Sequence, residues 1–295
     1  MKIEENRDKD VLKIDGLTNF NPPHIFECGQ AFRWNWDGQG YVGIVGDKVV
    51  RVLWDGTTLT LENTTYEDFN TIWQDYFDLN TDYGSIIEKL SKDPMLVEAI
   101  KHGWGIRILN QDPWETLISF IISARNGINR IKTTVEKISQ KFGEKITWAD
   151  KVYYKFPSVD ALANADEDEL RSCGCGYRGP YIKGTAQLIR SGEINLDTLM
   201  SIDYKDAKKQ LLKCPGVGPK VADCVLLFSL KKGQAFPVDV WIGRIMEELY
   251  SQEMKDFKDI REFAENRFGD IAGYAQQYLF YYAREKQIGK VSSRV

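Results

Sequence analysis

The sequence predicts an α+β fold, with an N-terminal antiparallel β-sheet domain over residues 1–105 and a mostly α-helical domain over residues 106–295. Three observations indicate this division. Residues 31–63 alternate apolar and polar side chains between turns, apolar positions follow a helical period from Asp68 onward, and a glycine-rich turn near residue 216 separates two helical segments. The chain has 295 residues, of which 43% are hydrophobic, and this composition is sufficient for a core in each of two domains.

The β domain is predicted from its turns. Aspartate and glycine are adjacent between alternating runs at three places: Asp37–Gly38, Gly46–Asp47 and Asp55–Gly56. Such pairs between runs of period two are typical of β-hairpins. We therefore expect an antiparallel meander of about four strands, with three tryptophans packed on one face: Trp34, Trp36 and Trp54.

The helical domain is predicted from one helix start and a series of amphipathic segments. Asp112 can cap a helix that begins at Pro113, and Glu115 follows three residues after the cap. Further helices are expected over residues 128–142, 160–171, 181–191, 205–213, 220–230, 240–250 and 271–285. Residues 170–178 resemble residues 212–220 in glycine spacing, which indicates either two similar helical hairpins or two helices that simply end at glycine.

Charge and cysteine content restrict the class of protein. The formal net charge is −4, whereas nucleic-acid-binding domains are usually basic, but residues 203–220 hold five lysines against two aspartates. An odd number of cysteines, five, is typical of reduced thiols in the cytoplasm. The chain begins with charged residues and has no apolar run of ~18 residues, so we expect neither a secretory signal nor a membrane span.

The glycine-rich turn over residues 214–220 indicates how a DNA backbone could be held. Gly216 and Gly218 allow positive φ angles and leave no side chain in the way of a close approach. Backbone N–H groups at the start of the following helix would then form an anion site for a phosphate. Such a site needs no cluster of arginines, so an acidic chain can still bind DNA.

Residues 211–244 carry two motifs at a fixed spacing. The turn 215–220 ends in Lys220, and Asp239 follows it by 19 residues in the segment Pro237–Val238–Asp239. This stretch resembles the helix-hairpin-helix DNA glycosylases, and residues 29–34, 110–113 and 272–276 make the chain most similar to the 8-oxoguanine DNA glycosylases among them. The resemblance implies a bifunctional DNA glycosylase and AP lyase that excises 8-oxoguanine from double-stranded DNA in base excision repair. We expect it to act as a monomer in the cytoplasm, at the nucleoid.

The resemblance also assigns the chemistry. Lys220 would attack C1′ of the damaged nucleotide and form a Schiff base, for which the amine must be neutral. The positive end of the helix dipole at Lys220 opposes the ammonium charge. Asp239 is predicted to cap the next helix and to stabilise the positive charge that develops at the sugar. The alternatives are that Lys220 is an ordinary surface lysine and that Asp239 is a cap only.

Four residues are implied to contact the flipped-out base. The Gly29 carbonyl would accept a hydrogen bond from N7 of the lesion, which carries a proton that guanine lacks. Gln276 would contact the pairing edge of the base. Phe280 and Cys224 would lie against its two faces, and ordinary core packing is the alternative for both.

The remaining candidates face the DNA strands or a cation. Four residues are predicted to fill the gap or contact the opposite base: Asn126, Arg130, Tyr177 and Arg178. Arg125 stands where the family carries asparagine, so we expect a less strict preference for opposite cytosine. Gly216 and Gly218 are predicted to contact phosphates, as is Trp241, which stands where many relatives carry histidine. The backbone carbonyls of Leu212, Cys214 and Val217 are candidates to bind a cation.

No cofactor is expected. The iron–sulfur cluster of some relatives needs four cysteines after the aspartate, and no cysteine follows Cys224. Three other interpretations stay open: a non-catalytic helix-hairpin-helix module that only holds DNA, a glycosylase for another damaged base, and a structural protein whose acidic surface meets other proteins. The first of these explains neither Asp239 nor the residues around Gly29.

Overall fold

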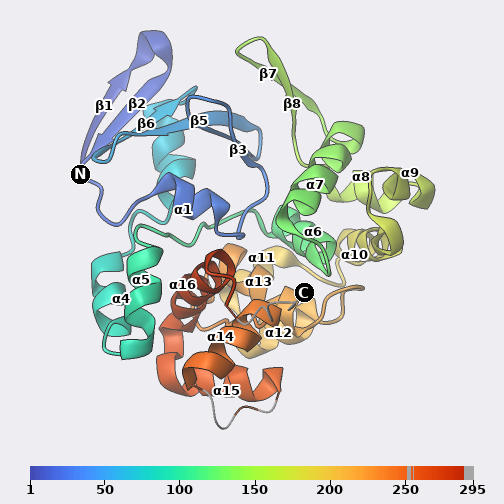
Figure 1. The fold of residues 1–295 in the computed structure, drawn as a ribbon. Helices are drawn as coiled ribbons and strands as arrows, with labels where there is room; N and C mark the ends of the chain where they lie inside the picture. The colour runs from blue at the N-terminus through green and yellow to red at the C-terminus, as the bar shows by residue number, and fades with distance from the viewer. Residues whose placement is uncertain (251–253, 255, 289–295) are drawn as a thin grey trace, which may run out of the picture.

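The computed structural model describes residues 1–250, 254 and 256–288, and its N-terminal third is built on one antiparallel sheet (Figure 1). The sheet has six strands in the order β1-β2-β6-β5-β4-β3. Their bounds are β1 (Lys2–Asn6), β2 (Val11–Asp15), β3 (Trp34–Trp36), β4 (Tyr41–Val45), β5 (Lys48–Trp54) and β6 (Thr58–Glu62). The predicted four-stranded meander is confirmed as β3 to β6. Strands β1 and β2 were not predicted, and β2 joins the meander by pairing with β6.

One face of the sheet packs against helical segments. Alternate residues such as Leu12, Val50 and Leu59 meet the helix α1 (Pro22–Glu27) and the continuous helical stretch of α2 (Tyr66–Asp68), a π-helical turn (Phe69–Trp73) and α3 (Gln74–Tyr76). Trp34 is buried here and stacks on Phe26, with the ring centroids 4.0 Å apart.

The expectation that all three tryptophans pack this face is wrong for one of them. Trp36 is 59% exposed, because it lies at the end of the short edge strand β3, beyond the helices that cover Trp34. Trp54 is half-buried, and its ring centroid lies 5.5 Å from that of Phe20.

The other face of the sheet is covered by a hairpin that belongs to the second half of the chain. Strands β7 (Lys145–Trp148) and β8 (Lys151–Tyr154) rise from the helical body toward the sheet in Figure 1. Their side chains Ile146, Trp148 and Tyr153 pack against a small cluster of buried valine and isoleucine residues on β4 and β5. This hairpin was not predicted, and it connects the two halves of the molecule.

The helical body follows the sheet. Its helices are α6 (Pro113–Ser123), α7 (Ile128–Phe142), α8 (Val159–Asn164), α9 (Glu167–Ser172), α10 (Gly179–Arg190), α11 (Leu196–Ser201), α12 (Tyr204–Leu211), α13 (Pro219–Ser229), α14 (Val240–Tyr250), α15 (Phe257–Phe268) and α16 (Ala272–Glu285). The expected cap at Asp112 is confirmed, since its side chain accepts the Glu115 N–H at 2.7 Å. No helix of the described residues is long and apolar enough to cross a bilayer.

The prediction of a single helix over residues 160–171 is wrong. The helix breaks at Ala165, and α9 starts anew because the Asp166 side chain accepts the N–H groups of Asp168 and Glu169. An aspartate at this position favours a cap over a continuous helix. Helices α11 and α15 were not predicted.

Two helices from the first third of the chain pack with the end of the chain. Residues of α4 (Tyr83–Leu90) and α5 (Val97–His102) share one hydrophobic core with α14, α15 and α16. The Asp93 carboxylate between them binds Arg267 of α15 at 2.5 Å and accepts the Tyr250 hydroxyl of α14 at 2.8 Å. In space these helices belong to the helical body, although they precede residue 105.

Candidate functional site

The glycine-rich turn joins α12 to α13 and exposes a stretch of backbone. Gly216 has a φ of +78°, and a Cβ atom there would come within 2.8 Å of the Tyr181 ring. Gly218 has an ordinary φ of −96°, and a Cβ atom there would meet nothing within 4 Å. Of the two glycines that allow a positive φ, only Gly216 adopts one. Packing leaves room for a side chain at Gly218, so the glycine there exposes backbone to whatever binds the turn.

The second glycine-rich turn packs against α10, the helix that follows the first. Tyr181 on α10 covers Gly216, and the Thr185 hydroxyl donates to the Pro215 carbonyl at 3.2 Å. Both turns join helices, but the first has positive φ at both glycines, Gly174 and Gly176. The two turns are therefore hairpins of different backbone conformation.

Lys220 is the second residue of α13 and reaches toward the end of α6. Its Nζ lies 3.5 Å from Oγ of Ser123 and 5.0 Å from the centroid of the Phe120 ring. The Ser123 hydroxyl donates to the Phe120 carbonyl at 2.7 Å, so its oxygen can accept an N–H from Lys220. The half-buried amine is held between helices and does not extend freely into solvent.

Cys224 lies one turn after Lys220 on α13. Burial raises the pKa of its thiol to about 12, although the neighbouring Lys220 lowers it. The thiol is therefore neutral at pH 7 and presents an uncharged surface. The carboxylates of Asp223 and Asp239 also raise this pKa.

Asp239 precedes α14 and caps it. One carboxylate oxygen, Oδ1, accepts the N–H groups of Trp241 and Ile242, each at 2.9 Å. The predicted cap is confirmed. Because both bonds go to Oδ1, the geometry holds the carboxylate by one oxygen at the helix N-terminus.

Gly29 and Phe280 lie against each other, although 251 positions separate them in the sequence. Gly29 follows α1 with a φ of +87°, and a Cβ atom there would lie 3.1 Å from the Phe280 ring and 3.3 Å from Nη1 of Arg284. Any side chain at this position would therefore be both strained and crowded. Arg284 was not singled out by the sequence, although its position one turn after Phe280 on the same face of α16 could have indicated it.

Gln276 lies two helical turns before Arg284 and is only 4% exposed. Its Nε2 donates to the Pro237 carbonyl at 3.1 Å, two residues before Asp239. Its Oε1 is buried with no hydrogen-bond partner. A buried acceptor without a donor is unfavourable by about 1–3 kcal/mol, and this oxygen is free to accept a donor from a bound molecule.

Two protein-family models together match most of the chain. Residues 14–117 match the family model of the 8-oxoguanine DNA glycosylase N-terminal domain. Residues 118–269 match the model of the HhH-GPD superfamily of base excision DNA repair proteins. The chain belongs to the HhH-GPD superfamily.

Individual relatives are similar to this chain over three quarters of its length or more. A probable N-glycosylase/DNA lyase of Methanothermobacter thermautotrophicus is 35% identical over 76% of each chain. The N-glycosylase/DNA lyase of Saccharomyces cerevisiae is 32% identical over 91% of this chain and 84% of its own. The crystal structure of Clostridium acetobutylicum 8-oxoguanine glycosylase/lyase, with dsDNA containing cytosine opposite 8-oxoG, is 45% identical with a TM-score of 0.95, covering 98% of this chain and 99% of that one.

In this HhH-GPD protein, the candidates for the opposite base lie around the turn after α6. Arg130 and Arg125 are exposed, and Arg125 has a φ of +57°. The Asn126 side chain donates back to the Ile122 carbonyl at 2.8 Å. Tyr177 is 57% exposed.

Arg178 occupies a different environment from the one expected of a DNA contact. It is 5% exposed, its Nη2 donates to the Ala124 carbonyl, and its Nη1 donates to the Cys175 carbonyl. Its guanidinium lies 4.3 Å from the centroid of the Tyr177 ring. In this conformation Arg178 holds the turn after α6 in place, and Tyr177 alone is exposed at the tip.

The residues predicted to contact a phosphate or a cation lie in the HhH-GPD domain. The half-buried Trp241 ring lies 5.4 Å from the Arg244 guanidinium. The Cys214 carbonyl accepts the Val217 N–H at 3.1 Å, which leaves it one lone pair. The cation at Leu212, Cys214 and Val217 stays a prediction. Among the described residues, no group of three or more histidine, cysteine or acidic side chains could hold a metal.

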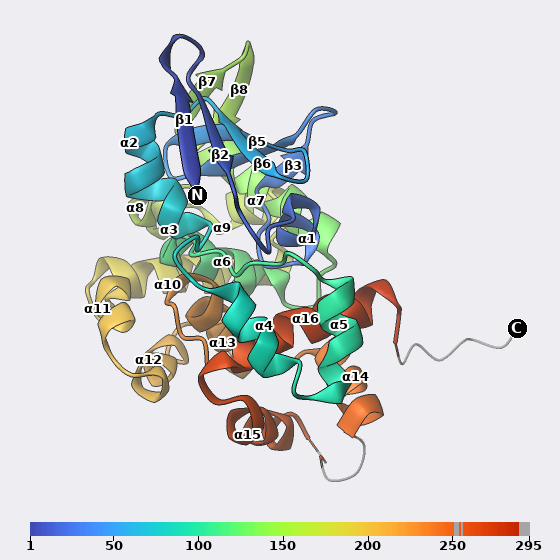
Figure 2. The ribbon, with the colours of Figure 1, turned by 90° about the vertical axis from the view of Figure 1, so that its left-hand side faces the viewer.

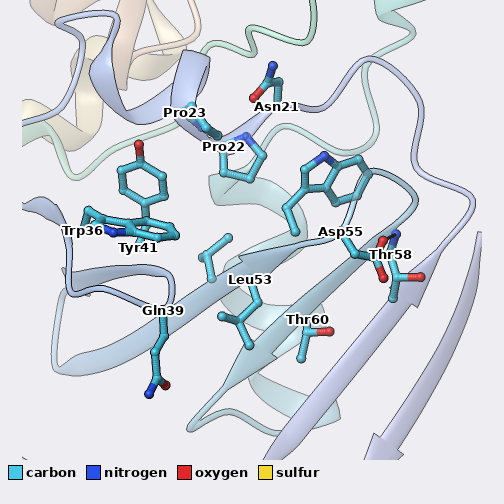
Figure 3. Close-up of a pocket in the computed structure, with 12 residues that line it drawn as sticks. Asn21, Pro22, Pro23, Trp36, Gln39, Tyr41, Leu53, Asp55, Thr58 and Thr60 are labelled. Atoms are coloured by element: carbon cyan, nitrogen blue, oxygen red, sulfur yellow. Dashed lines mark hydrogen bonds between the residues drawn. The ribbon is translucent and has the colours of Figure 1, made fainter.

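A pocket of about 310 Å³ lies on the N-terminal domain, between α1 and the sheet (Figure 3). Aromatic and proline side chains, among them Pro22, Trp36, Tyr41 and Trp54, form its walls. None of the predicted site residues lines it. The candidate catalytic residues of this HhH-GPD protein therefore lie outside this pocket.

Proposed function

We propose that this chain is a bifunctional DNA glycosylase and AP lyase that removes 8-oxoguanine from double-stranded DNA, with Lys220 as its nucleophile. The observation that carries the proposal is that Lys220 lies beside Ser123, one turn before Cys224, while Gln276, with its unpartnered oxygen, bonds the Pro237 carbonyl two residues before Asp239. The similarity to the Clostridium acetobutylicum enzyme supports the choice of lesion.

The reaction follows from the chemistry of the amine. Neutral Lys220 attacks C1′ as the bond from C1′ to the base breaks, and the departing base takes up a proton. The nitrogen then gives one proton to the ring oxygen as the C1′–O4′ bond breaks, and the ring opens to a protonated Schiff base. The amine lies near the N-terminus of α13, 5.0 Å from the centroid of the Phe120 ring. Asp239 stabilises the positive charge that develops at the sugar.

The flipped base is read by groups around it. The Gly29 carbonyl accepts the N7 proton, and Gln276 contacts the pairing edge. Phe280 and the neutral thiol of Cys224 lie against the two faces of the ring. The bare backbone at Gly216 and Gly218 holds a phosphate, with Trp241 nearby, and the exposed Arg130 and Tyr177 reach the opposite strand. Asn126 and Arg178 form the turn that carries them.

The test is borohydride trapping on a duplex that carries one 8-oxoguanine opposite cytosine. The wild-type protein should form a covalent complex, and Lys220→Gln should lose both the complex and base excision while it still binds DNA. Lys213→Gln is the matched control, because Lys213 is an exposed lysine on the same hairpin. Trapping by the Lys220 variant would move the nucleophile elsewhere, and binding without excision by the wild type would favour a non-catalytic module.

The partner and setting belong to the same proposal. We infer that the protein acts as a monomer on duplex DNA at the nucleoid, in the cytoplasm. Phosphate contacts predict that affinity falls steeply as salt rises. A DNA titration at two salt concentrations, with sedimentation of the free protein, measures both properties.

A further inference from the structure

The backbone turn after α1 has its carbonyl groups held by side chains from distant parts of the chain. The Glu27 carbonyl accepts Nη2 of Arg284 at 2.5 Å, and the Cys28 carbonyl accepts Nε2 of Gln277 at 3.0 Å. The Gln30 carbonyl accepts Nε2 of Gln111 at 2.8 Å. Between them, the Gly29 carbonyl has no hydrogen-bond donor within the described part of the chain.

Two of these donors come from one helix. Gln277 and Arg284 are seven residues apart on α16, which is two helical turns and therefore the same side of the helix. In Figures 1 and 2, α16 runs directly beneath α1, so one rigid element spans the turn from below. The same helix carries Gln276 and Phe280, which the proposed function assigns to the base.

Both donors are well placed to hold the turn still. Gln277 is 1% exposed, and the Arg284 side chain is 18% exposed while its guanidinium lies 5.7 Å from the Phe280 ring centroid. A buried amide keeps its geometry, because leaving its donor unpaired is unfavourable. The backbone positions before Gly29 are thus tied to the helix that lines the base.

We propose that Gln277 and Arg284 are positioning residues for lesion discrimination, which hold the Glu27 and Cys28 carbonyls so that the Gly29 carbonyl is left to face N7 of the base. This inference rests on the proposed function. A carbonyl aimed at N7 attracts the N7 proton of 8-oxoguanine and repels the lone pair of guanine, so a shift of this turn weakens selection of the lesion. The step at an abasic site contains no base, and it does not depend on the turn.

The experiment compares two activities of each variant under single-turnover conditions. Gln277→Met and Arg284→Met remove the donors and keep side chains of similar length, and Lys286→Met at the exposed end of α16 is the control. One substrate carries 8-oxoguanine opposite cytosine, and the other is the same duplex with a preformed abasic site. We expect base excision to slow roughly 10- to 100-fold in both donor variants, with abasic-site cleavage within about twofold of wild type. Thermal unfolding of each variant reports whether it is folded.

The outcomes separate this inference from the proposed function. If the wild type excises 8-oxoguanine and both donor variants excise it at the wild-type rate, the positioning role alone is overturned. An equal loss of both activities in folded variants would overturn it as well, because the defect would not lie in reading the base. A wild-type protein that excises no 8-oxoguanine would remove the proposed function together with this inference.

Discussion

Asp239 caps a helix and carries the charge that we propose acts on the sugar, and the two roles can be separated by one substitution. Asparagine caps helices as well as aspartate, so Asp239→Asn should keep the bonds to Trp241 and Ile242 and lose only the charge. We expect excision of 8-oxoguanine to fall about 10²- to 10⁴-fold, with lesion binding nearly unchanged. Single-turnover rates and affinity titrations measure the two effects.

The matched control is another aspartate cap. Asp203 caps α12 through the N–H groups of Lys205 and Asp206, and Asp203→Asn should leave the rate unchanged. If Asp239→Asn keeps its rate per folded molecule, Asp239 is a cap only.

Arg125 bears on the base opposite the lesion. We expect the protein to prefer cytosine opposite 8-oxoguanine, because exposed arginine donors such as Arg130 match the two acceptors on the cytosine edge. The preference should be less strict than in relatives with asparagine, and Arg125→Asn should raise the ratio of excision opposite cytosine over adenine by about 5-fold or more. Excision rates opposite all four bases test this, and equal rates opposite cytosine and adenine in the wild type would contradict it.

The burial of individual side chains could not be predicted from the sequence. The sequence predicted the same DNA-facing role for three residues on turns, Asn126, Tyr177 and Arg178. Of these, Tyr177 alone is strongly exposed. Arg178 is buried because the turn after α6 folds over it and presents the Ala124 carbonyl. A sequence shows the residue type and the turn, but not the segment that covers it.

At the scale of elements, Asp93 joins the segment between α4 and α5 to α14 and α15. Burial raises the pKa of this carboxyl, but its bonds to Arg267, to the Met95 N–H and to Tyr250 outweigh burial and hold the pKa below its usual value. A lowered folded pKa stabilises the protein above the unfolded pKa of ~3.9, and this stability is lost as the pH falls through the folded pKa.

Asp93→Asn should therefore lower the free energy of unfolding at pH 7 by about 1–2 kcal/mol, a value that allows for the partly exposed Arg267. The difference from wild type should shrink below pH 4. Urea unfolding at several pH values measures it. Asp206→Asn, which breaks an exposed pair with Lys209, is the control and should change stability by less than about 0.5 kcal/mol. An Asp93 effect that is constant with pH would contradict the assignment.

The elements themselves were predictable where local signals were strong. The meander from β3 to β6 and the starts of α6 and α13 follow from turn residues, capping residues and apolar spacing. The break at Ala165 was missed because the apolar pattern continues across it, while the cap at Asp166 is a competing local interaction. Strands β7 and β8 gain their stability from contact with the sheet, which has no local signal.

At the scale of the whole molecule, the two halves of the chain are interlocked. The β7–β8 hairpin covers the sheet, and α4 and α5 pack in the core of the last helices. We therefore expect one cooperative unfolding transition, with far-ultraviolet circular dichroism and tryptophan fluorescence coinciding.

Trp148→Ala should lower the melting temperature by about 2–4 °C, because Trp148 packs on the sheet and against the Arg51 guanidinium at 5.1 Å. Trp36→Ala, at a tryptophan that is 59% exposed, should change it less. Two separate transitions in the wild type would show that the halves unfold independently.

The sequence by itself determined the α+β class, the glycine hairpin, and the spacing of Lys220 and Asp239, because these depend on turns, caps and motifs within a few dozen residues. The tertiary structure alone decided that Gly29 meets Phe280 and Arg284, that Lys220 lies by Ser123, and that Gln276 keeps an unpartnered oxygen. These contacts join segments far apart in the chain. Their geometry follows from how helices and sheet pack, and a one-dimensional pattern does not encode it locally.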